Sequence, residues 1–191
     1  MCSSDLIVDE ETDRLTSAVT DAIQMARIEA GQIELRKGPR SIADLVRQSL
    51  SKLAASLDTR PVEFRVSADL PPVAADPELV HIVIRQLLDN AIKYSPPDSL
   101  ISIEASLERD AVVVSVADRG SGVPEPDRNR VFEKFYRGRE ARERIPGTGM
   151  GLAIAREIVL AHNGEIRVES RSGAGSRFRF SLPVAKEAAC P

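Results

Sequence analysis

Apolar residues recur at helical spacing in the N-terminal part of the chain. They lie three or four positions apart, at Leu15, Ala18, Ala22 and Met25. Gly31 follows where a helix commonly ends, so the pattern predicts a long amphipathic helix over residues 6–30. Its apolar stripe is small and rich in alanine, which suits close packing against another helix. That partner is either a helix outside this chain or the chain's own domain.

Helical and strand patterns then follow in a mixed order. Ser41 is a candidate N-cap for a helix running through Leu57, and Asp76 followed by Pro77 marks the start of another helix. A fourth helix is expected over residues 148–161, and strands over residues 63–68, 100–107, 111–117, 165–170 and 176–182. The order predicts an α+β fold, with one mixed or antiparallel sheet faced by helices.

Composition limits the possible classes of protein. A chain of 191 residues that is 42% hydrophobic can bury one sizeable core, so we expect one main domain. A net charge of −3 gives no general attraction to nucleic acid or to anionic membranes. The longest apolar run, residues 111–117, falls far short of the about 20 residues that span a bilayer. We therefore expect a cytoplasmic segment without membrane contact, and we treat Cys2 and Cys190 as incidental thiols.

The helix after Asp76 carries a candidate ligand-binding face. Its apolar side contains Val80, Ile84, Leu87, Leu88 and Ala91. Gln86, Asn90 and Lys93 lie together on the opposite side. The Asn90 oxygen suits a hard cation such as Mg²⁺, and Lys93 could reach a phosphate. A solvated polar face is the alternative interpretation of this helix taken alone.

Asp118 ends a buried-looking strand and is followed by Gly120 and Gly122. These glycines would let the backbone approach a planar ligand closely. A carboxylate at this place could accept a hydrogen bond from an exocyclic amine such as that of adenine. Taken alone, this Asp-x-Gly-x-Gly run would more often be an ordinary turn.

A glycine-rich run, Gly147-Thr148-Gly149-Met150-Gly151, precedes the last of the expected helices, whose N-terminal amides could bind phosphate. It is not a Walker loop, because no Gly-Lys-Ser/Thr follows, and it fits a dinucleotide fingerprint poorly. The preceding loop contains Arg137, Arg139, Arg142 and Arg144. We interpret it as a mobile cationic lid over a triphosphate. A nucleic-acid patch is the rival interpretation, but Glu140 and Glu143 dilute the positive charge. Neither histidine, His81 or His162, is a candidate for catalysis.

Taken together, these clusters resemble the catalytic ATP-binding domain of sensor histidine kinases, in the ATPase superfamily shared with gyrase, Hsp90 and MutL. The matching motifs, in family order, are QLLDNAIKYS, DRGSGVP, VFEKFYRG, GTGMGL and GAGSRFRFSLP. The resemblance covers about residues 41–184. It implies a two-layer α/β sandwich of the Bergerat type. Residues 6–31 are similar to the second helix of the family's dimerisation and phosphoacceptor hairpin.

The resemblance also implies boundaries and roles. It divides the chain into a partial hairpin (1–31), a linker (32–40), the catalytic domain (41–186) and a tail (187–191). Asn90 would hold Mg²⁺, Lys93 would contact phosphate and Asp118 would bind the adenine amino group. Asn90, Lys93 and Arg137 would be the catalytic set. The other residues implied to bind the nucleotide are Tyr94, Gly120, Gly122, Phe132, Phe135, Gly147, Thr148, Gly149, Gly151, Leu152 and Ser176.

The implied function is transfer of the ATP γ-phosphate to a histidine of a dimerisation domain, for relay to a response regulator Asp, within a homodimeric full-length protein. Two features depart from the family. Gln86 stands where the superfamily's hydrolases place a Glu general base, and an amide cannot take a proton from water. The acceptor His box is missing, so we expect a fragment or truncated chain that binds ATP without autophosphorylating. A degenerate nucleotide-binding regulatory module and a gyrase-type ATPase are the alternatives, and an anti-sigma type of serine kinase shares the same pocket.

Overall fold

The long N-terminal helix and the mixed sheet predicted from the sequence are both present in the computed structural model, which describes residues 3–31, 34–57, 60–138, 145, 147–170 and 175–185. The helices are α1 (Ser3–Glu29), α2 (Ile42–Lys52), α3 (Ala54–Leu57), α4 (Pro77–Tyr94) and α6 (Gly151–Ala161). Two short 3-10 helices are η1 (Glu125–Asp127) and η2 (Arg130–Phe132). The strands are β1 (Gly38–Arg40), β2 (Val62–Val66), β3 (Val73–Ala75), β4 (Ile101–Glu108), β5 (Ala111–Ala117), β6 (Ile166–Ser170) and β7 (Ser176–Pro183).

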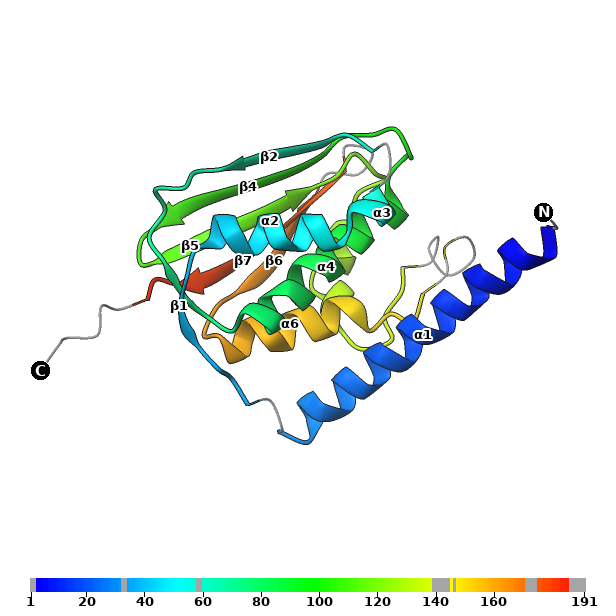
Figure 1. Cartoon of the computed structure of the whole chain (residues 1–191), viewed down its shortest axis with the longest axis horizontal. Helices are drawn as coiled ribbons and strands as arrows, with labels where there is room; N and C mark the ends of the chain where they lie inside the picture. The colour runs from blue at the N-terminus through cyan, green and yellow to red at the C-terminus, as the bar shows by residue number, and fades with distance from the viewer. Residues whose placement is uncertain are drawn as a thin grey trace, which may run out of the picture.

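One five-stranded sheet, in the order β2-β4-β5-β7-β6, forms one layer of the domain. Strands β2 and β4 are parallel, and the other neighbours are antiparallel. Helices α2, α4 and α6 cover one face of the sheet, and α1 lies beyond α6 (Figure 1). The opposite face is charged, with Glu104 3.7 Å from Arg65 and 3.8 Å from Arg177. The predicted α+β sandwich with a mixed sheet is confirmed.

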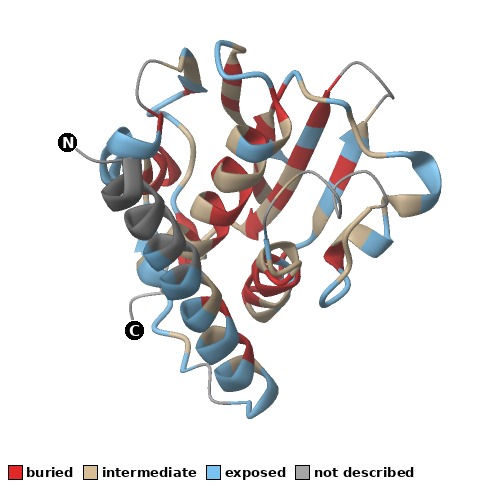
Figure 2. Ribbon diagram, turned by 90° about the vertical axis from the view of Figure 1, so that its right-hand side faces the viewer, coloured by how far each residue is buried: buried red, intermediate tan, exposed pale blue. Residues whose placement is uncertain are grey.

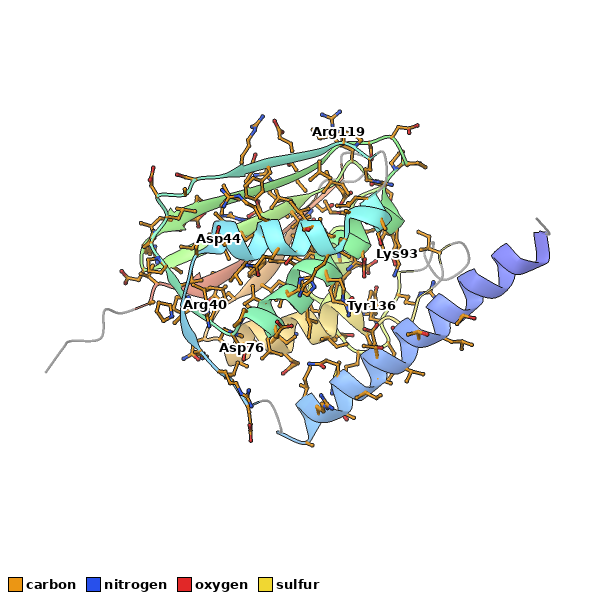
Figure 3. The ribbon with its side chains drawn as sticks, viewed as in Figure 1. Arg40, Asp44, Asp76, Lys93, Arg119 and Tyr136 are labelled. Atoms are coloured by element: carbon orange, nitrogen blue, oxygen red, sulfur yellow. The ribbon has the colours of Figure 1, made fainter. Side chains whose placement is uncertain are left out.

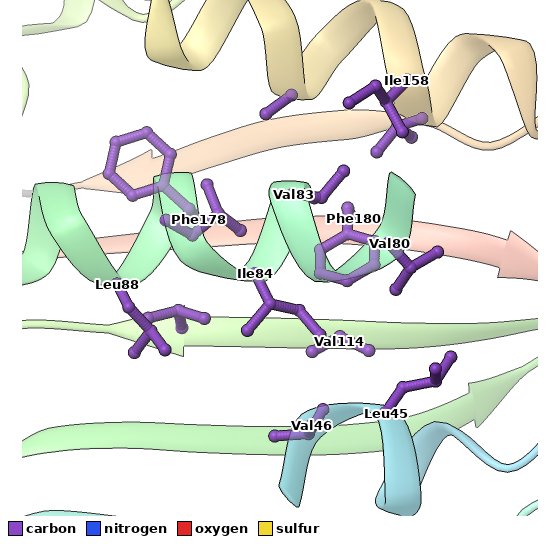
Figure 4. Packing of buried hydrophobic residues seen from close by; sticks show 14 of the residues in the cluster. Leu45, Val46, Val80, Val83, Ile84, Leu88, Val114, Ile158, Phe178 and Phe180 are labelled. Atoms are coloured by element: carbon purple, nitrogen blue, oxygen red, sulfur yellow. The ribbon is translucent and has the colours of Figure 1, made fainter. Parts of the chain in front are cut away.

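Helix α4 is the centre of the core. All five residues of its predicted apolar side are at most 2% exposed. Figure 4 shows Ile84 of this helix close to Val114 of the sheet and Val80 close to Phe180. Burying a side chain of this size contributes about 1.5–3 kcal/mol. This packing fixes the axial rotation of α4 and therefore which side of the helix remains for a ligand.

Side-chain caps start two helices where the sequence predicted them. The Ser41 hydroxyl accepts a hydrogen bond from the Asp44 amide at 3.3 Å. The Asp76 carboxylate accepts from the amides of Glu78 and Leu79 at 3.1 and 3.3 Å. The helix that begins after Ser41 is shorter than predicted. It ends at Lys52, where the backbone turns to bury Leu53, and a separate short helix, α3, follows.

The predicted connector before Ser41 contains a strand that the sequence did not reveal. Strand β1 pairs antiparallel with β3 and forms a two-stranded ribbon beside the main sheet. The Asp76 carboxylate also accepts a hydrogen bond from the Arg36 amide at 2.9 Å. The ribbon therefore brings the connector close to the start of α4.

His162 joins the end of α6 to the start of α4. It is 1% exposed, its Nε2 accepts from the Asp76 amide at 3.0 Å, and its Nδ1 donates to the Ile158 carbonyl at 2.8 Å. This pattern requires a neutral ring with the proton on Nδ1. Burial lowers the pKa of His162 below its ordinary value of 6.5, and the charge of Lys37 lowers it further.

We expect the free energy of unfolding to fall as the pH drops below 6.5. In the unfolded chain His162 takes up a proton near pH 6.5, whereas the folded chain resists protonation until the pH reaches the lowered pKa. The contribution is complete above pH 6.5 and is lost below it. Urea unfolding between pH 5 and 8 measures this slope, and His162→Gln flattens it.

His81 contributes to the same slope, because burial also lowers its pKa; since these are the chain's two histidines, His81→Gln measures the His81 share separately. Comparing each variant with the wild type cancels the carboxyl groups that titrate in the same range. A pH slope that is unchanged in His162→Gln would contradict this prediction.

Candidate nucleotide site

A cavity of about 560 Å³ opens beside the C-terminal half of α4. Its walls come from α4, the segment after β5, the start of α6 and helix α1. Ligand pockets for drug-sized molecules have volumes of about 300–1,000 Å³. The cavity is therefore large enough for a nucleotide. In Figure 3, Lys93 and Tyr136, which both line the cavity, lie between the domain's helices and α1.

The last two turns of α4 supply Asn90, Lys93 and Tyr94 to the cavity. The Asn90 amide nitrogen donates to the Gln86 carbonyl at 2.9 Å. The side-chain oxygen of Asn90 is thus the atom suited to a cation. Lys93 is exposed, and burial raises the pKa of the Tyr94 hydroxyl. This side of α4 combines one hard oxygen, one cationic side chain and one aromatic ring.

Asp118 lies directly after β5 and is 8% exposed. Its Oδ1 accepts hydrogen bonds from the amides of Gly120 at 2.7 Å and Ser176 at 3.3 Å. Within the described residues these are the carboxylate's hydrogen bonds, so Oδ2 is the atom left for a ligand. Burial raises the pKa of Asp118, while the two amide donors and the charge of Arg60 act in the opposite direction.

Two of the predicted glycines are required by close contacts. A Cβ at Gly120 would lie 2.1 Å from the Tyr94 carbonyl oxygen, so only glycine lets this segment pack on the end of α4. Gly149 has a φ of +72°, and a Cβ there would lie 2.9 Å from the backbone carbonyl oxygen of Tyr136. These contacts fix two walls of the cavity relative to each other.

Twelve of the fifteen predicted site residues line this cavity: Asn90, Lys93, Tyr94, Asp118, Gly122, Arg137, Gly147, Thr148, Gly149, Gly151, Leu152 and Ser176. The remaining three, Gly120, Phe132 and Phe135, lie outside its lining. The predicted lid arginines 139, 142 and 144 and the two cysteines lie outside the described residues. Arg137 is described, and its guanidinium donates to the Ile145 carbonyl.

The two phenylalanines implied to bind the nucleotide, Phe132 and Phe135, have different surroundings. Phe132 is 7% exposed and packs edge-on against Phe178, with ring centroids 6.3 Å apart. Phe178 itself lines the cavity, so Phe132 supports the wall from behind. Phe135 is 67% exposed, and its amide donates to the Gly149 carbonyl at 3.0 Å. Phe135 therefore contacts the glycine-rich segment through its backbone amide, and its side chain is not part of the cavity lining.

Several lining residues were not predicted as site residues. Asp89 lies next to Asn90, and burial raises the pKa of its carboxyl group, while the nearby Lys93 lowers it. Tyr136 carries the guanidinium of Arg130 4.4 Å from its ring centroid, and a hydrogen bond with Asp127 raises the pKa of its hydroxyl. The motif VFEKFYRG contained Tyr136, so the sequence did hold a signal for this residue.

Residues 75–186 match the family described as histidine kinase-, DNA gyrase B-, and HSP90-like ATPase. The chain belongs to this family. Among its relatives, the sensor-like histidine kinase SenX3 of Mycobacterium tuberculosis (strain ATCC 25618 / H37Rv) is 34% identical over 93% of this chain and 44% of its own length. The adaptive-response sensory kinase SasA of Synechocystis sp. (strain ATCC 27184 / PCC 6803 / Kazusa) is 38% identical over 90% of this chain and 45% of its own.

Comparison with solved structures also finds histidine kinases. Full-length ShkA in complex with AMPPNP has a TM-score of 0.81 and 31% identity, over 98% of this chain and 39% of that one. The mycobacterial sensor histidine kinase MprB has a TM-score of 0.66 and 27% identity, over 77% of this chain and 97% of that one. The expected histidine kinase type of ATP-binding catalytic domain is confirmed over the gyrase type. The chain spans less than half the length of the SenX3 and SasA relatives that it matches. In the described part of the chain, no helix has the length and apolar character needed to cross a membrane.

Proposed function

We propose that this domain binds Mg-ATP and donates its γ-phosphate to a histidine on a dimerisation domain, from which the phosphate passes to an aspartate of a response regulator. One observation carries the proposal: two motifs that are separate in the sequence place Asn90, Lys93 and Asp118 around one cavity. Phosphoryl transfer requires mainly positioning and neutralisation of charge, and this set of side chains suits both tasks.

The donors around the cavity fit a metal that arrives with the nucleotide. Within the described residues, no group of three or more His, Cys, Asp or Glu side chains could hold a metal ion. Mg²⁺ usually takes few protein ligands and completes its shell with substrate phosphates and water. The Asn90 oxygen would hold it, Lys93 and Arg137 would contact the phosphates, and Asp118 would accept from the adenine amine. When bound, the metal would neutralise the charge of the phosphates.

We also propose that α1 is the second helix of a dimerisation hairpin. It carries an exposed apolar row, Leu15, Val19 and Ile23, at 66%, 56% and 51% exposure. These residues lie four apart and share one side of the helix, and Figure 2 shows exposed residues along α1. Soluble helices rarely leave such a row uncovered, so a partner helix in a homodimeric full-length protein would cover it.

Transfer to an added acceptor tests the function. The chain is mixed with the separate dimerisation hairpin of a sensor kinase relative and with ATP labelled in the γ-phosphate. We expect label on the acceptor histidine, as a P–N bond forms, the bond to the β-phosphate breaks and ADP leaves. An acceptor with His→Ala controls for other sites. Nucleotide binding without transfer would favour a degenerate regulatory module, and steady phosphate release without acceptor would favour a hydrolase.

A further inference from the structure

Asp21 is a buried carboxylate that helix α1 places in the wall of the nucleotide cavity. It is 7% exposed, and it lines the cavity although α1 lies outside the sandwich. A buried carboxylate is costly unless hydrogen-bond donors or positive charges satisfy it. The groups that satisfy Asp21 therefore indicate what this contact between α1 and the domain does.

Three groups of the domain meet this one carboxylate. The Gln86 side-chain amide donates to Oδ1 at 3.0 Å, and the Thr148 hydroxyl donates to Oδ2 at 3.4 Å. The Arg85 guanidinium lies 4.0 Å from Oδ1. Gln86 and Arg85 belong to α4, and Thr148 belongs to the glycine-rich segment that enters α6. Asp21 thus links α1 to two walls of the cavity at once.

Both hydrogen-bonded partners are tied to predicted nucleotide-binding elements. The Gln86 backbone carbonyl accepts a hydrogen bond from the Asn90 side chain at 2.9 Å. The side-chain oxygen of Gln86 lies 2.1 Å from where a Cβ of Gly151 would be. The Thr148 hydroxyl also accepts from the Met150 amide at 3.3 Å, at the start of α6. A shift of Asp21 would therefore reach the metal-binding Asn90 and the start of α6.

The contact gives Gln86 a structural role. A partner for Asp21 at this position must donate a hydrogen bond, and the Gln86 amide does so. A Glu at position 86 would place two carboxylates together, and among the described residues Arg85 is the cation that is paired with Asp21 and could offset their repulsion. An amide is thus the side chain that keeps α1 attached to the cavity.

We propose that Asp21 is a positioning residue of the nucleotide site, which holds Gln86 and Thr148 in place and couples nucleotide binding to the position of α1. This inference rests on the proposed function. Because coupling between two equilibria is reciprocal, a nucleotide in the cavity would in turn hold α1 more firmly against the domain.

The first experiment compares three variants by calorimetric titration with Mg-AMPPNP. Asp21→Ala should weaken binding about tenfold, in line with the loss of hydrogen bonds to a charged group. Asp21→Asn should retain affinity within about threefold, because an amide can still accept from Gln86. Glu29→Gln is the matched control, since it removes the charge from a different polar link of α1, the ion pair with Lys134 at 2.5 Å, and Lys134 lies outside the cavity lining.

Equal loss in Glu29→Gln and Asp21→Ala would overturn the inference, because any loosening of α1 would then suffice. Wild-type affinity in Asp21→Ala, at an unchanged melting temperature, would overturn it as well. A purely structural role would lower the melting temperature of Asp21→Ala without changing affinity in the chain that remains folded.

The second experiment reverses the hydrogen bond. Gln86→Glu should speed amide hydrogen exchange in α1 severalfold in the nucleotide-free chain, and adding Asp21→Asn should restore protection, because the new amide donates to the new carboxylate. This measurement needs no nucleotide. If Asp21→Asn restores protection but the wild-type chain binds no ATP analogue, the proposed function is refuted and the contact made by Asp21 stands. If exchange in Gln86→Glu is the same as in the wild type, the role of Asp21 is refuted.

Discussion

Asp118→Asn binds ATP analogues about tenfold to a hundredfold more weakly than the wild type, and the variant still folds. The amides of Gly120 and Ser176 already donate to Oδ1, so they orient the new side chain with its oxygen toward them. Its NH₂ group then faces the adenine amine, and two donors oppose each other. Losing a hydrogen bond to a charged group costs about 1.5–3 kcal/mol. Folding tolerates the change, because burial already disfavours the ionised form of Asp118.

Calorimetric titration with AMPPNP measures this loss, and thermal unfolding checks the fold. Asp110→Asn makes the same chemical change at an exposed position at the opposite end of β5 and should leave affinity unchanged. A guanine nucleotide carries a carbonyl oxygen in place of the adenine amine, so its affinity should rise relative to that of AMPPNP in the variant. Equal affinities of wild type and variant for AMPPNP would remove Asp118 from the site.

Asn90→Ala abolishes the effect of Mg²⁺ on nucleotide affinity and lowers transfer to an added acceptor on the order of 100-fold. Alanine has no side-chain oxygen for the metal. Losing a residue that only hydrogen-bonds to a metal ligand already costs about 10–100-fold in metal affinity or activity. The helix persists, because alanine is the best helix former and the lost bond to the Gln86 carbonyl contributes only about 1 kcal/mol.

Parallel titrations with Mg²⁺ and with a chelator measure this effect. Asn129→Ala is the control, since it removes an exposed amide outside the cavity lining. If Mg²⁺ still strengthened binding to Asn90→Ala as it does in the wild type, the metal would have to be held by another group.

The parts of the fold that follow from short-range chemistry could be predicted from the sequence. The caps at Ser41 and Asp76 depend on side chains that bond amides two or three residues away, and the apolar side of α4 depends on spacing alone. The same holds for the hairpin of β4 and β5, which needs only a short turn. These signals are local, so they survive in the sequence without knowledge of the packing.

The remaining features depend on contacts between distant segments. Strands β1 and β3 have three residues each, too few to show an alternating pattern, and their pairing joins residues 38–40 to 73–75. Asp21 lies on a helix whose pattern predicts only an apolar stripe, and nothing local indicates that it lines the cavity. Phe132 and Phe135 are three apart in one motif, yet the first packs on Phe178 and the second is exposed.

The hydrogen bond between the Phe135 amide and the Gly149 carbonyl closes the intervening chain into a loop whose two ends touch. The entropic cost of closing such a loop grows only with the logarithm of its length, about 0.6 kcal/mol for each doubling. An insertion between these ends would therefore cost little conformational entropy, provided that Arg137, Gly147 and Thr148 keep their places in the cavity lining. Asn90 and Asp118 lie outside this segment, on α4 and directly after β5, so a change in its length would leave their own helix and strand intact.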